Sequence, residues 1–272
     1  MSSTSSPADA AARAAVVEAL ADELHGAWST RRTVPPLRER HPALTIDDAY
    51  RISLGFIARR RAAGERIVGK KIGVTSKAVQ DMLGVHQPDF GFLTDAMQVP
   101  DGGVIDIAAR MIQPRAEAEI ALILGAPLKG PGVTPADVLA ATASLAPCFE
   151  VVDSRIDRWD IRIVDTVADN ASCGLFVLGA ARVPPAGLDL AALEVRVRKN
   201  GAPLSRGLGS AVQGSPLAAV AWLANTLGAY GVTLDAGDII LSGSLVPLET
   251  ARPGDLFELD CDALGGASVR FS

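Results

Sequence analysis

The sequence has little of what marks several classes of protein. Aromatic residues make up only 4% of the 272 residues, which argues against the stacking surfaces that bind single-stranded nucleic acid. The formal net charge is -5, so there is no basic excess to attract nucleic acid or an anionic membrane. No uncharged apolar run reaches the about 18 residues of a membrane span, and the N-terminal MSSTSSPADA lacks the pattern of a secretory signal. We therefore expect a cytoplasmic protein with no nucleic-acid or membrane partner.

Cysteine is also scarce and unpatterned. The three cysteines are odd in number, lie far apart and form no C-x-x-C motif; they are Cys148, Cys173 and Cys261. Disulfide frameworks and zinc sites need regular, paired spacings. We expect three reduced and mostly buried thiols.

Three common catalytic motifs are approached but not completed. GERIVGKK, residues 64–71, nearly matches the phosphate-binding G-x-x-x-x-G-K-[ST], but Lys71 replaces the hydroxyl residue and the strand-loop-helix context is reversed. The glycines of residues 206–214 have the wrong spacing for a dinucleotide fingerprint. No histidine neighbours a G-x-S-x-G motif, so a Ser-His-Asp hydrolase has no support, and we expect His25 and His41 to be surface residues.

Helical patterns dominate the first quarter of the chain. Pro7 at a first helical position predicts an alanine-rich helix that runs to about Gly26. Thr45 is the expected cap of a second helix that ends at Gly64. We therefore predict an N-terminal helical region over residues 1–65.

Short strand-like runs, separated by glycine and proline, dominate residues 66–272. Asn200-Gly201 is a hairpin turn signal, and Ser215-Pro216 predicts the start of one clear helix. The candidate strands are RIVGKKIGVT, AEIALIL, CFEVVD, GLFVLG, LEVRVRKNG, DIILSG and GASVRFS. Because strands outnumber helices without a regular βαβ alternation, we predict an α+β fold with a mixed or antiparallel sheet.

The stretch QPRAEAEIALIL, residues 113–124, places two acidic side chains in an apolar strand. Alternation puts Glu117 and Glu119 on one face, about 6.6–6.8 Å apart along the strand. Ala121 and Ile123 continue that face, which predicts that it is at least half covered. Burying ionised carboxylates is costly unless a proton or a cation compensates.

Spacing alone leaves two interpretations of this pair open. The first is a solvated edge face, and the second is a shared cation, for which oxygen ligands favour Mg²⁺ or Mn²⁺. Glu150, isolated in the apolar run CFEVVD, is the best candidate for a third ligand. We expect Asp153 and Asp157 to be turn and surface residues.

A pair of lysines in IVGKKIGV raises a similar question. In a strand, Lys70 and Lys71 point to opposite faces, so at most one points inward. An inward lysine could neutralise a substrate carboxylate or move a proton. The alternative is a pair of exposed strand lysines.

Several long segments resemble the 2-hydroxypenta-2,4-dienoate hydratases (2-keto-4-pentenoate hydratases). This family lies in the hydratase/decarboxylase branch of the fumarylacetoacetate-hydrolase-like superfamily. The segments are ERIVGKKIGVTSKAVQDMLGVHQPDFGFLTDAM, QPRAEAEIALIL, CFEVVDSRI, DTVADNASCGLFVLG and AVAWLANTLGAYGVTLDAGDIILSGSLVPLE. The resemblance implies a fumarylacetoacetase C-terminal-like mixed β-sheet roll as the catalytic domain over residues 66–272, after the small N-terminal helical region.

The resemblance also implies which residues carry the chemistry. It implies a metal site of three glutamates, which are Glu117, Glu119 and Glu150. It implies Lys71 as a catalytic lysine, Asp89 as an acidic catalytic residue and Ser172 as a polar contact. The implied cofactor is Mg²⁺ or Mn²⁺.

The implied reaction is hydration of a small 2-hydroxydienoate to 4-hydroxy-2-oxopentanoate in the meta-cleavage pathway of aromatic catabolism. Similar hydratases form homo-oligomers and associate with 4-oxalocrotonate decarboxylase, so we expect both kinds of assembly. The similar 4-oxalocrotonate decarboxylases share much of the pattern and stay an alternative. A non-catalytic partner subunit would not need the ion-binding residues, and an acylpyruvate hydrolase would need a histidine beside the glutamate pair.

Overall fold

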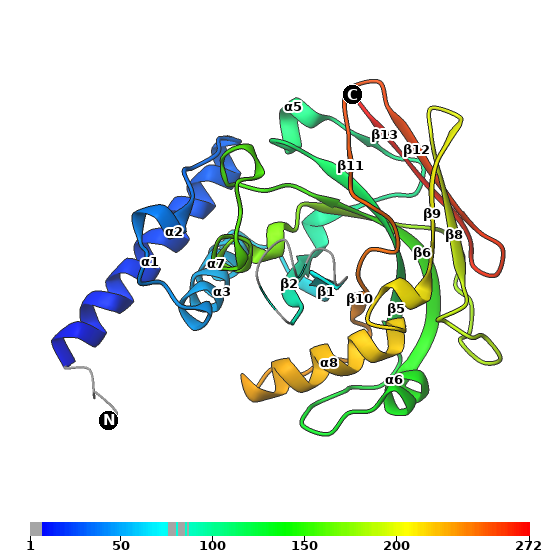
Figure 1. The fold of residues 1–272 in the computed structure, drawn as a ribbon, viewed down its shortest axis with the longest axis horizontal. Coiled ribbons are helices and arrows are strands. Elements are labelled where there is room, and N and C mark those ends of the chain that lie inside the picture. The colour runs from blue at the N-terminus through cyan, green and yellow to red at the C-terminus, as the bar shows by residue number, and fades with distance from the viewer. Residues whose placement is uncertain (1–6, 76–79, 81–84, 86) are drawn as a thin grey trace.

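The structure is a computed structural model that describes residues 7–75, 80, 85 and 87–272. Three helices at the N-terminus lie on one side of the molecule (Figure 1). They are α1 (Pro7–Thr30), α2 (Leu37–Arg40) and α3 (Ile46–Ala62). No helix among the described residues is both long and apolar enough to cross a membrane.

Local sequence signals explain the two long helices. The Thr45 side chain accepts from the Asp48 backbone N–H and Asp48 accepts in return, which completes a capping box at the start of α3. After α3, Gly64 takes a left-handed φ of 104°, as expected for the end of a helix. The first helix continues to Thr30, four residues beyond the predicted end at Gly26, because its buried stripe still packs on α3 there.

A large mixed sheet forms the body of the fold. Its strand order is β2-β1-β10-β5-β6-β7-β3, with β11 also paired to β5. The pairs β1–β10 and β3–β7 are parallel and the others are antiparallel. The strands are β1 (Ile67–Gly73), β2 (Asp89–Thr94), β3 (Gln98–Val99), β5 (Arg115–Leu124), β6 (Thr142–Val152), β7 (Leu175–Leu178), β10 (Ile239–Leu241) and β11 (Glu249–Thr250).

A second, five-stranded sheet packs against the long strands of the first. Its order is β4-β13-β12-β8-β9, and Asn200-Gly201 makes the predicted hairpin between β8 and β9. Phe149 on β6 contacts Phe257 on β12, with ring centroids 6.3 Å apart, so the core lies between the sheets. The strands are β4 (Val104–Ile105), β8 (Glu194–Lys199), β9 (Ala202–Leu208), β12 (Leu256–Cys261) and β13 (Gly265–Phe271).

Helices complete the second half of the chain. The predicted helix after Ser215 is α8 (Pro216–Ala229), and the Ser215 hydroxyl accepts from the Leu217 N–H. The shorter helices are α5 (Ile107–Arg110), α6 (Pro135–Ala141) and α7 (Ile163–Ala168), with short 3₁₀ segments at Asp95–Met97, Asp157–Trp159, Asn170–Ser172 and Gly209–Ala211. The predicted α+β class with a mixed β-sheet roll is confirmed, whereas the division into domains at residue 65 stays a prediction.

Candidate active site and metal centre

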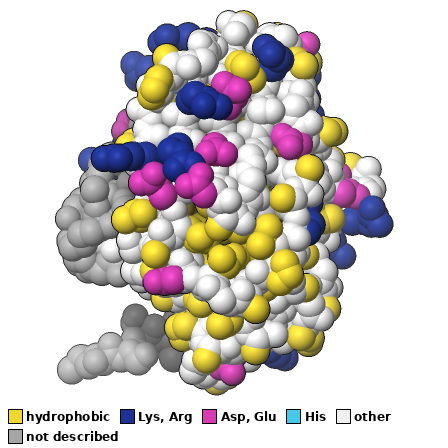
Figure 2. Space-filling view, turned by 90° about the vertical axis from the view of Figure 1, so that its right-hand side faces the viewer, with side chains coloured by type: hydrophobic (Ala, Val, Ile, Leu, Met, Phe, Trp, Pro, Cys, Tyr) yellow, Lys and Arg dark blue, Asp and Glu magenta, His cyan; other side chains and the backbone are white. Residues whose placement is uncertain are grey.

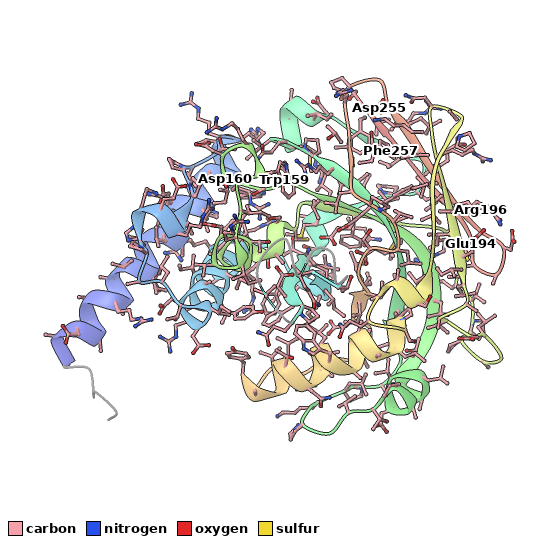
Figure 3. The ribbon with its side chains drawn as sticks, in the orientation of Figure 1. Trp159, Asp160, Glu194, Arg196, Asp255 and Phe257 are labelled. Carbon is pink, nitrogen blue, oxygen red and sulfur yellow. The ribbon has the colours of Figure 1, made fainter. Side chains whose placement is uncertain are left out.

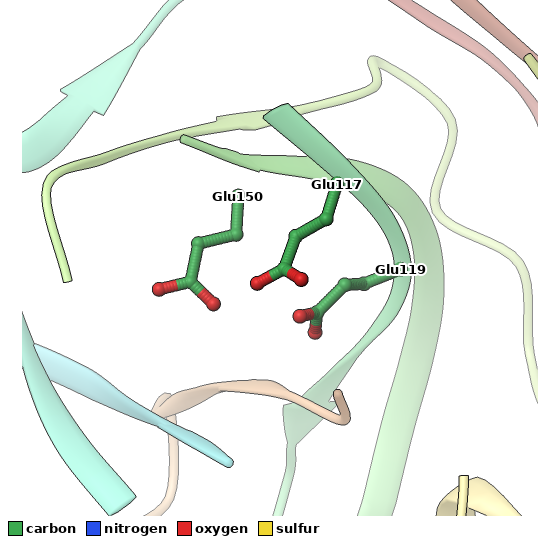
Figure 4. A group of neighbouring side chains, drawn as sticks. All are labelled: Glu117, Glu119 and Glu150. Carbon is green, nitrogen blue, oxygen red and sulfur yellow. The ribbon is translucent and has the colours of Figure 1, made fainter. Parts of the chain in front are cut away.

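Three glutamates meet on one face of the β5–β6 pair. The antiparallel register places Glu117 directly opposite Glu150, and Glu119 opposite Cys148. Each glutamate offers a carboxylate oxygen, and these oxygens all lie within 4.8 Å of one another. Figure 4 shows the three carboxyl groups pointing to a common side of the strands. The other face of β5 carries Ala118 and Ile120, fully buried towards the core, as the alternation predicts.

The cluster is buried, and protein donors do not satisfy it. Glu119 and Glu150 are completely inaccessible and Glu117 is only 8% exposed. The Gly243 N–H donates to one Glu119 oxygen at 2.7 Å. The other Glu119 oxygen and both Glu150 oxygens have no hydrogen-bond partner. Buried carboxylates left in this state are costly, so the solvated-edge interpretation is wrong.

Burial and mutual repulsion together act on the protonation of the cluster. Burial first and the Glu150 charge second raise the pKa of Glu117 to about 8. The same two causes, with the charge of Glu117, raise the pKa of Glu119 well above its usual value. Without a cation, the site therefore holds protons at a pH where exposed carboxylates are ionised.

The donor set fits a hard divalent cation. Carboxylate oxygens are the ligands that Mg²⁺, Mn²⁺ and Ca²⁺ prefer. Two oxygens on opposite sides of one ion, at bond lengths of about 2.0–2.6 Å, are separated by about 4–5 Å. The observed limit of 4.8 Å falls in that range, and one oxygen of Glu119 and one of Glu150 have neither a hydrogen bond nor an ion pair among the described residues.

Lys71 is the inward lysine of the pair. Its Nζ lies 3.2 Å from a Glu150 oxygen, and both side chains are buried. Burial alone would lower the pKa of Lys71, but the Glu150 and Asp89 carboxylates outweigh it and hold that pKa above its usual value. Lys70 points to the opposite face of β1 and forms a buried ion pair with Asp238. The pair is therefore not exposed on either face.

Asp89 begins β2 beside Lys71. One of its oxygens lies 3.4 Å from the Thr166 hydroxyl, which in turn lies 3.4 Å from the Ser172 hydroxyl. Its other oxygen is buried without a hydrogen-bond partner. Burial raises the pKa of Asp89, and the Lys71 ammonium partly offsets this. The sequence did not single out Thr166, which joins the two predicted residues.

A left-handed turn delivers Ser172 to the site. Asn170, Ala171 and Ser172 have φ values of 52°, 51° and 53°, although none is glycine. Each such residue costs about 1–2 kcal/mol. The Asn170 amide compensates, because its oxygen accepts from the Phe92 N–H at 2.8 Å and its nitrogen donates to the Phe92 carbonyl at 3.0 Å. These bonds fix the turn against β2, three residues after Asp89.

A buried ion pair supports this turn from behind. Arg155 pairs with Asp169, and its guanidinium also donates to the Cys173 carbonyl at 2.8 Å. The expectation that Asp153 is a surface residue is wrong. It is 5% exposed and accepts from the backbone N–H groups of Ile112 and Gln113, which anchors the entry to β5.

Four of the six predicted site residues line one cavity of about 560 Å³; they are Lys71, Asp89, Glu117 and Ser172. A cavity of this size suits a small organic ligand. The carboxylates of Glu119 and Glu150 lie close to that of Glu117. The remaining wall is largely apolar and includes Val152, Trp159, Ile161, Leu245 and Leu248.

The histidines that the structure describes take no part in the site. The His25 ring packs between Trp28 and Phe56, with centroids at 5.5 and 6.3 Å, so it is half-buried and not a free surface residue. Burial lowers its pKa. His86 lies outside the described residues. All three cysteines are free and buried, as predicted.

Comparison with known proteins gives consistent results. Residues 66–272 match the family described as fumarylacetoacetate (FAA) hydrolase, C-terminal. The chain is 58% identical over 257 residues to a 2-hydroxyhexa-2,4-dienoate hydratase of Comamonas testosteroni, covering 94% of this chain and 97% of the relative. It is 60% identical over 217 residues to a 2-hydroxypent-2,4-dienoate hydratase of Pseudomonas putida, covering 80% and 98%.

A solved structure has the same fold over nearly the whole chain. It is 4-oxalocrotonate decarboxylase from Pseudomonas putida G7, complexed with magnesium and adipate. The TM-score is 0.91 at 38% identity, covering 94% of this chain and 97% of the decarboxylase. A second structure of that enzyme is complexed with calcium and acetate. On its sequence, its fold and its relatives, the chain belongs to the fumarylacetoacetate hydrolase C-terminal family.

Proposed function

We propose that this protein hydrates 2-hydroxypenta-2,4-dienoate, by way of its 2-oxo tautomer, to 4-hydroxy-2-oxopentanoate, and that the reaction depends on Mg²⁺ or Mn²⁺. The observation that carries the proposal is the buried group of three carboxylates beside Lys71, with unpaired oxygens that need a cation. The hydratases at 58% and 60% identity support the choice of reaction. The reaction has its place in aromatic catabolism by the meta-cleavage pathway.

The reaction adds one water and moves protons between carbon and oxygen. Protonation at C5 and loss of the C2 hydroxyl proton give the 2-oxo-enoate. The oxygen of water then bonds to C4, and C3 takes up a proton. No redox change occurs, so the site needs only to hold the substrate, stabilise negative charge at C2 and transfer protons.

Three glutamates would hold the ion, namely Glu117, Glu119 and Glu150. When bound, a divalent ion would supply a Lewis acid to a chelating 2-oxo acid. The apolar strands β5 and β6 keep the glutamates away from bulk water, which strengthens their attraction for a cation.

Lys71 and Asp89 are the proposed proton-transfer residues. Both are buried at the cavity, and Asp89 keeps one oxygen unpaired. Burial raises the pKa of Asp89, so this carboxyl group keeps a proton to a higher pH than an exposed one, which suits it to donate that proton to carbon. Thr166 and Ser172 would orient the attacking water, and their contact with each other beside Asp89 supports this role.

Decarboxylation of 4-oxalocrotonate is the second candidate. It is favoured by the likeness, at a TM-score of 0.91, to the decarboxylase complexed with magnesium and adipate. An assay of both substrates with added Mg²⁺ separates the two activities. We expect hydration of the dienoate without release of CO₂ from 4-oxalocrotonate, and the reverse result would overturn the proposal.

Association with other chains is part of the proposal, as a homo-oligomer and in a complex with the pathway decarboxylase. Strand β9 supports it, because it is an edge strand with Leu204 and Leu208 exposed by 39% and 45%. Figure 2 shows hydrophobic side chains gathered on the side of the molecule where β8 and β9 lie in Figure 1. Light scattering of the purified protein, alone and mixed with the decarboxylase, tests both associations.

A further inference from the structure

Arg115 is a cationic residue on the wall of the cavity, and it has no role in the ion binding or proton transfer proposed above. It is the first residue of β5, two positions before Glu117, so both side chains lie on the same face of the strand. It lines the cavity together with Glu117 and Val152, its cross-strand neighbour. Along β5 the backbone positions of Arg115 and Glu117 are about 6.6–6.8 Å apart, and both side chains line the same cavity.

Arg115 differs from the other partly or fully buried cations in having no counter-ion. Four cationic side chains are buried in the described structure, and each pairs with a carboxylate; the pairs are Arg60–Glu65, Lys70–Asp238, Lys71–Glu150 and Arg155–Asp169. Within the described ranges, Arg115 contacts the face of Trp159 instead, with its Cζ 4.5 Å from the ring centroid. Burial alone lowers the pKa of Arg115, since no charged neighbour acts on it.

Trp159 is a fixed platform for this guanidinium. Its indole N–H donates to the Gln113 carbonyl at 2.9 Å. Trp159 and the preceding Arg158 have left-handed φ values of 58° and 54°, a costly conformation that persists only where the surroundings require it. Figure 3 shows Trp159 on the segment after β6, next to the long strands of the sheet. A guanidinium that lies over an aromatic ring can still donate hydrogen bonds from its N–H edge.

The sum of the charges in the site bears on how it can bind a substrate anion. The three glutamates, one divalent ion and the protonated Lys71 carry no net charge together, so they offer a substrate anion no excess positive charge. Two arginines add positive charge to the cavity wall; Arg158 is exposed, whereas Arg115 is partly buried on the strand face of the glutamates, with no ion pair to a carboxylate among the described residues. A planar guanidinium edge matches a carboxylate, which it can bind through two parallel hydrogen bonds.

We propose that Arg115, held against Trp159, binds the carboxylate of the 2-oxo acid substrate. The proposal rests on the proposed function for the identity of the ligand, and it makes Arg115 a substrate-binding residue separate from the proton-transfer pair. It also explains why an acidic cavity accepts an anion. The residue discriminates the acid from a neutral molecule of the same shape.

The test is a binding measurement without turnover, in the full-length protein loaded with Mn²⁺. Calorimetry compares 2-oxobutanoate with its neutral amide, 2-oxobutanamide, for the native protein and Arg115→Met. We expect the variant to bind the acid about 10- to 100-fold more weakly and the amide within about 3-fold of native. Arg115→Lys keeps the positive charge but cannot form two parallel hydrogen bonds to a carboxylate, so we expect an intermediate loss of affinity for the acid. Arg270→Met, at an exposed arginine of β13 that does not line the cavity, is the matched control and should bind both ligands as the native protein does.

Three results would overturn the inference. They are equal weakening of acid and amide in Arg115→Met, no weakening of either, and failure of the native protein to bind 2-oxobutanoate in the presence of Mn²⁺. Unchanged Mn²⁺ affinity and melting temperature show that the variant is folded. If Arg115→Met does not fold, the comparison of acid and amide binding is made with Arg115→Lys. Because no turnover is measured, a protein that binds as expected but does not hydrate the dienoate would contradict the proposed function alone.

Discussion

At the scale of single residues, the site is defined by charges that do not cancel without a ligand. Glu117, Glu119 and Glu150 are buried together, and Lys71 is the one cation that an ion pair connects to them within the described residues. Evolution usually avoids such groups in cores because they destabilise the fold. The same repulsion that destabilises the metal-free protein would favour binding of a divalent ion.

Replacement of Lys71 by methionine separates proton transfer from metal binding. We expect kcat for dienoate hydration to fall about 10²- to 10⁴-fold in Lys71→Met, as for loss of a general acid–base group. Mn²⁺ affinity should stay the same or increase, because the positive charge 3.2 Å from Glu150 is removed. Steady-state kinetics and Mn²⁺ titration measure the two quantities. A variant with normal kcat would remove Lys71 from the mechanism.

The metal-free protein should lose stability as the pH rises. The pKa of Glu117 is about 8 in the folded chain, against about 4.3 in an unfolded one. Between these values the folded state keeps a proton that the unfolded state has lost, so the free energy of unfolding falls as pH increases. In urea denaturation with a chelator, we expect the native protein to be at least about 1 kcal/mol less stable at about pH 8 than at about pH 5.5, relative to Glu117→Gln. Parallel pH profiles for the two proteins would contradict this.

At the scale of elements, the site depends on β2 and the left-handed turn staying in close contact. Gly91 on β2 faces this turn, and a Cβ at that position would lie 2.5 Å from the Asn170 carbonyl oxygen. Glycine is required there by close approach, since neither backbone can move away without moving Asp89 or Ser172. The three consecutive left-handed residues are strained, and this conformation fixes the position of the Ser172 hydroxyl.

Gly91→Ala tests this contact. We expect a loss of about 1–3 kcal/mol in the free energy of unfolding, because the added methyl group meets backbone atoms. We also expect a lower kcat/KM, since Asp89 and Ser172 shift apart. The matched control is Gly26→Ala in α1, where a Cβ meets nothing within 4 Å, and this should be neutral or stabilising. Equal effects of the two substitutions on activity would argue against the positioning role of the contact.

Elements with strong local signals could be predicted from the sequence. The alternation in β5, the Asn200-Gly201 hairpin and the Ser215 cap each depend on a few neighbouring residues, and each prediction is confirmed. The two-residue strands β3, β4 and β11 were missed, and β6 begins at Thr142 instead of near Cys148. The longer strands β2, β9 and β12 were missed as well. Their sequences carry glycines, prolines or charges that conceal the period of two, and pairing with distant strands decides their conformation.

The site shows the same division between local and distant causes. The alternation within β5 is enough to predict that Glu117 and Glu119 share a covered face. That Glu150 lies directly opposite Glu117 depends on the register of two strands, which spacing alone does not specify. The contact of Arg115 with Trp159 had a partial signal, since Arg115 shares the alternation of the glutamates, but the loop that brings Trp159 there has none.

At the scale of the whole molecule, the two sheets contribute to the site in different ways. The five-stranded sheet covers the apolar face of β5 and β6, so their acidic face is turned to the cavity. The parallel pair β1–β10 joins residues about 170 positions apart (Figure 1), and Lys71 on β1 forms its ion pair with Glu150 on β6. Arrangements of such long range make the site a property of the complete fold and not of any one motif.

The central claim is that the three glutamates hold the divalent ion on which hydration depends. The most direct test follows dienoate hydration by the chelator-treated protein while Mn²⁺ or Mg²⁺ is added back, beside the variant Glu117→Ala. The account predicts that the treated protein is inactive, that the ion restores it, and that the variant keeps its fold but recovers neither ion binding nor activity. Full activity in the chelator-treated protein, or in the treated variant, would contradict it.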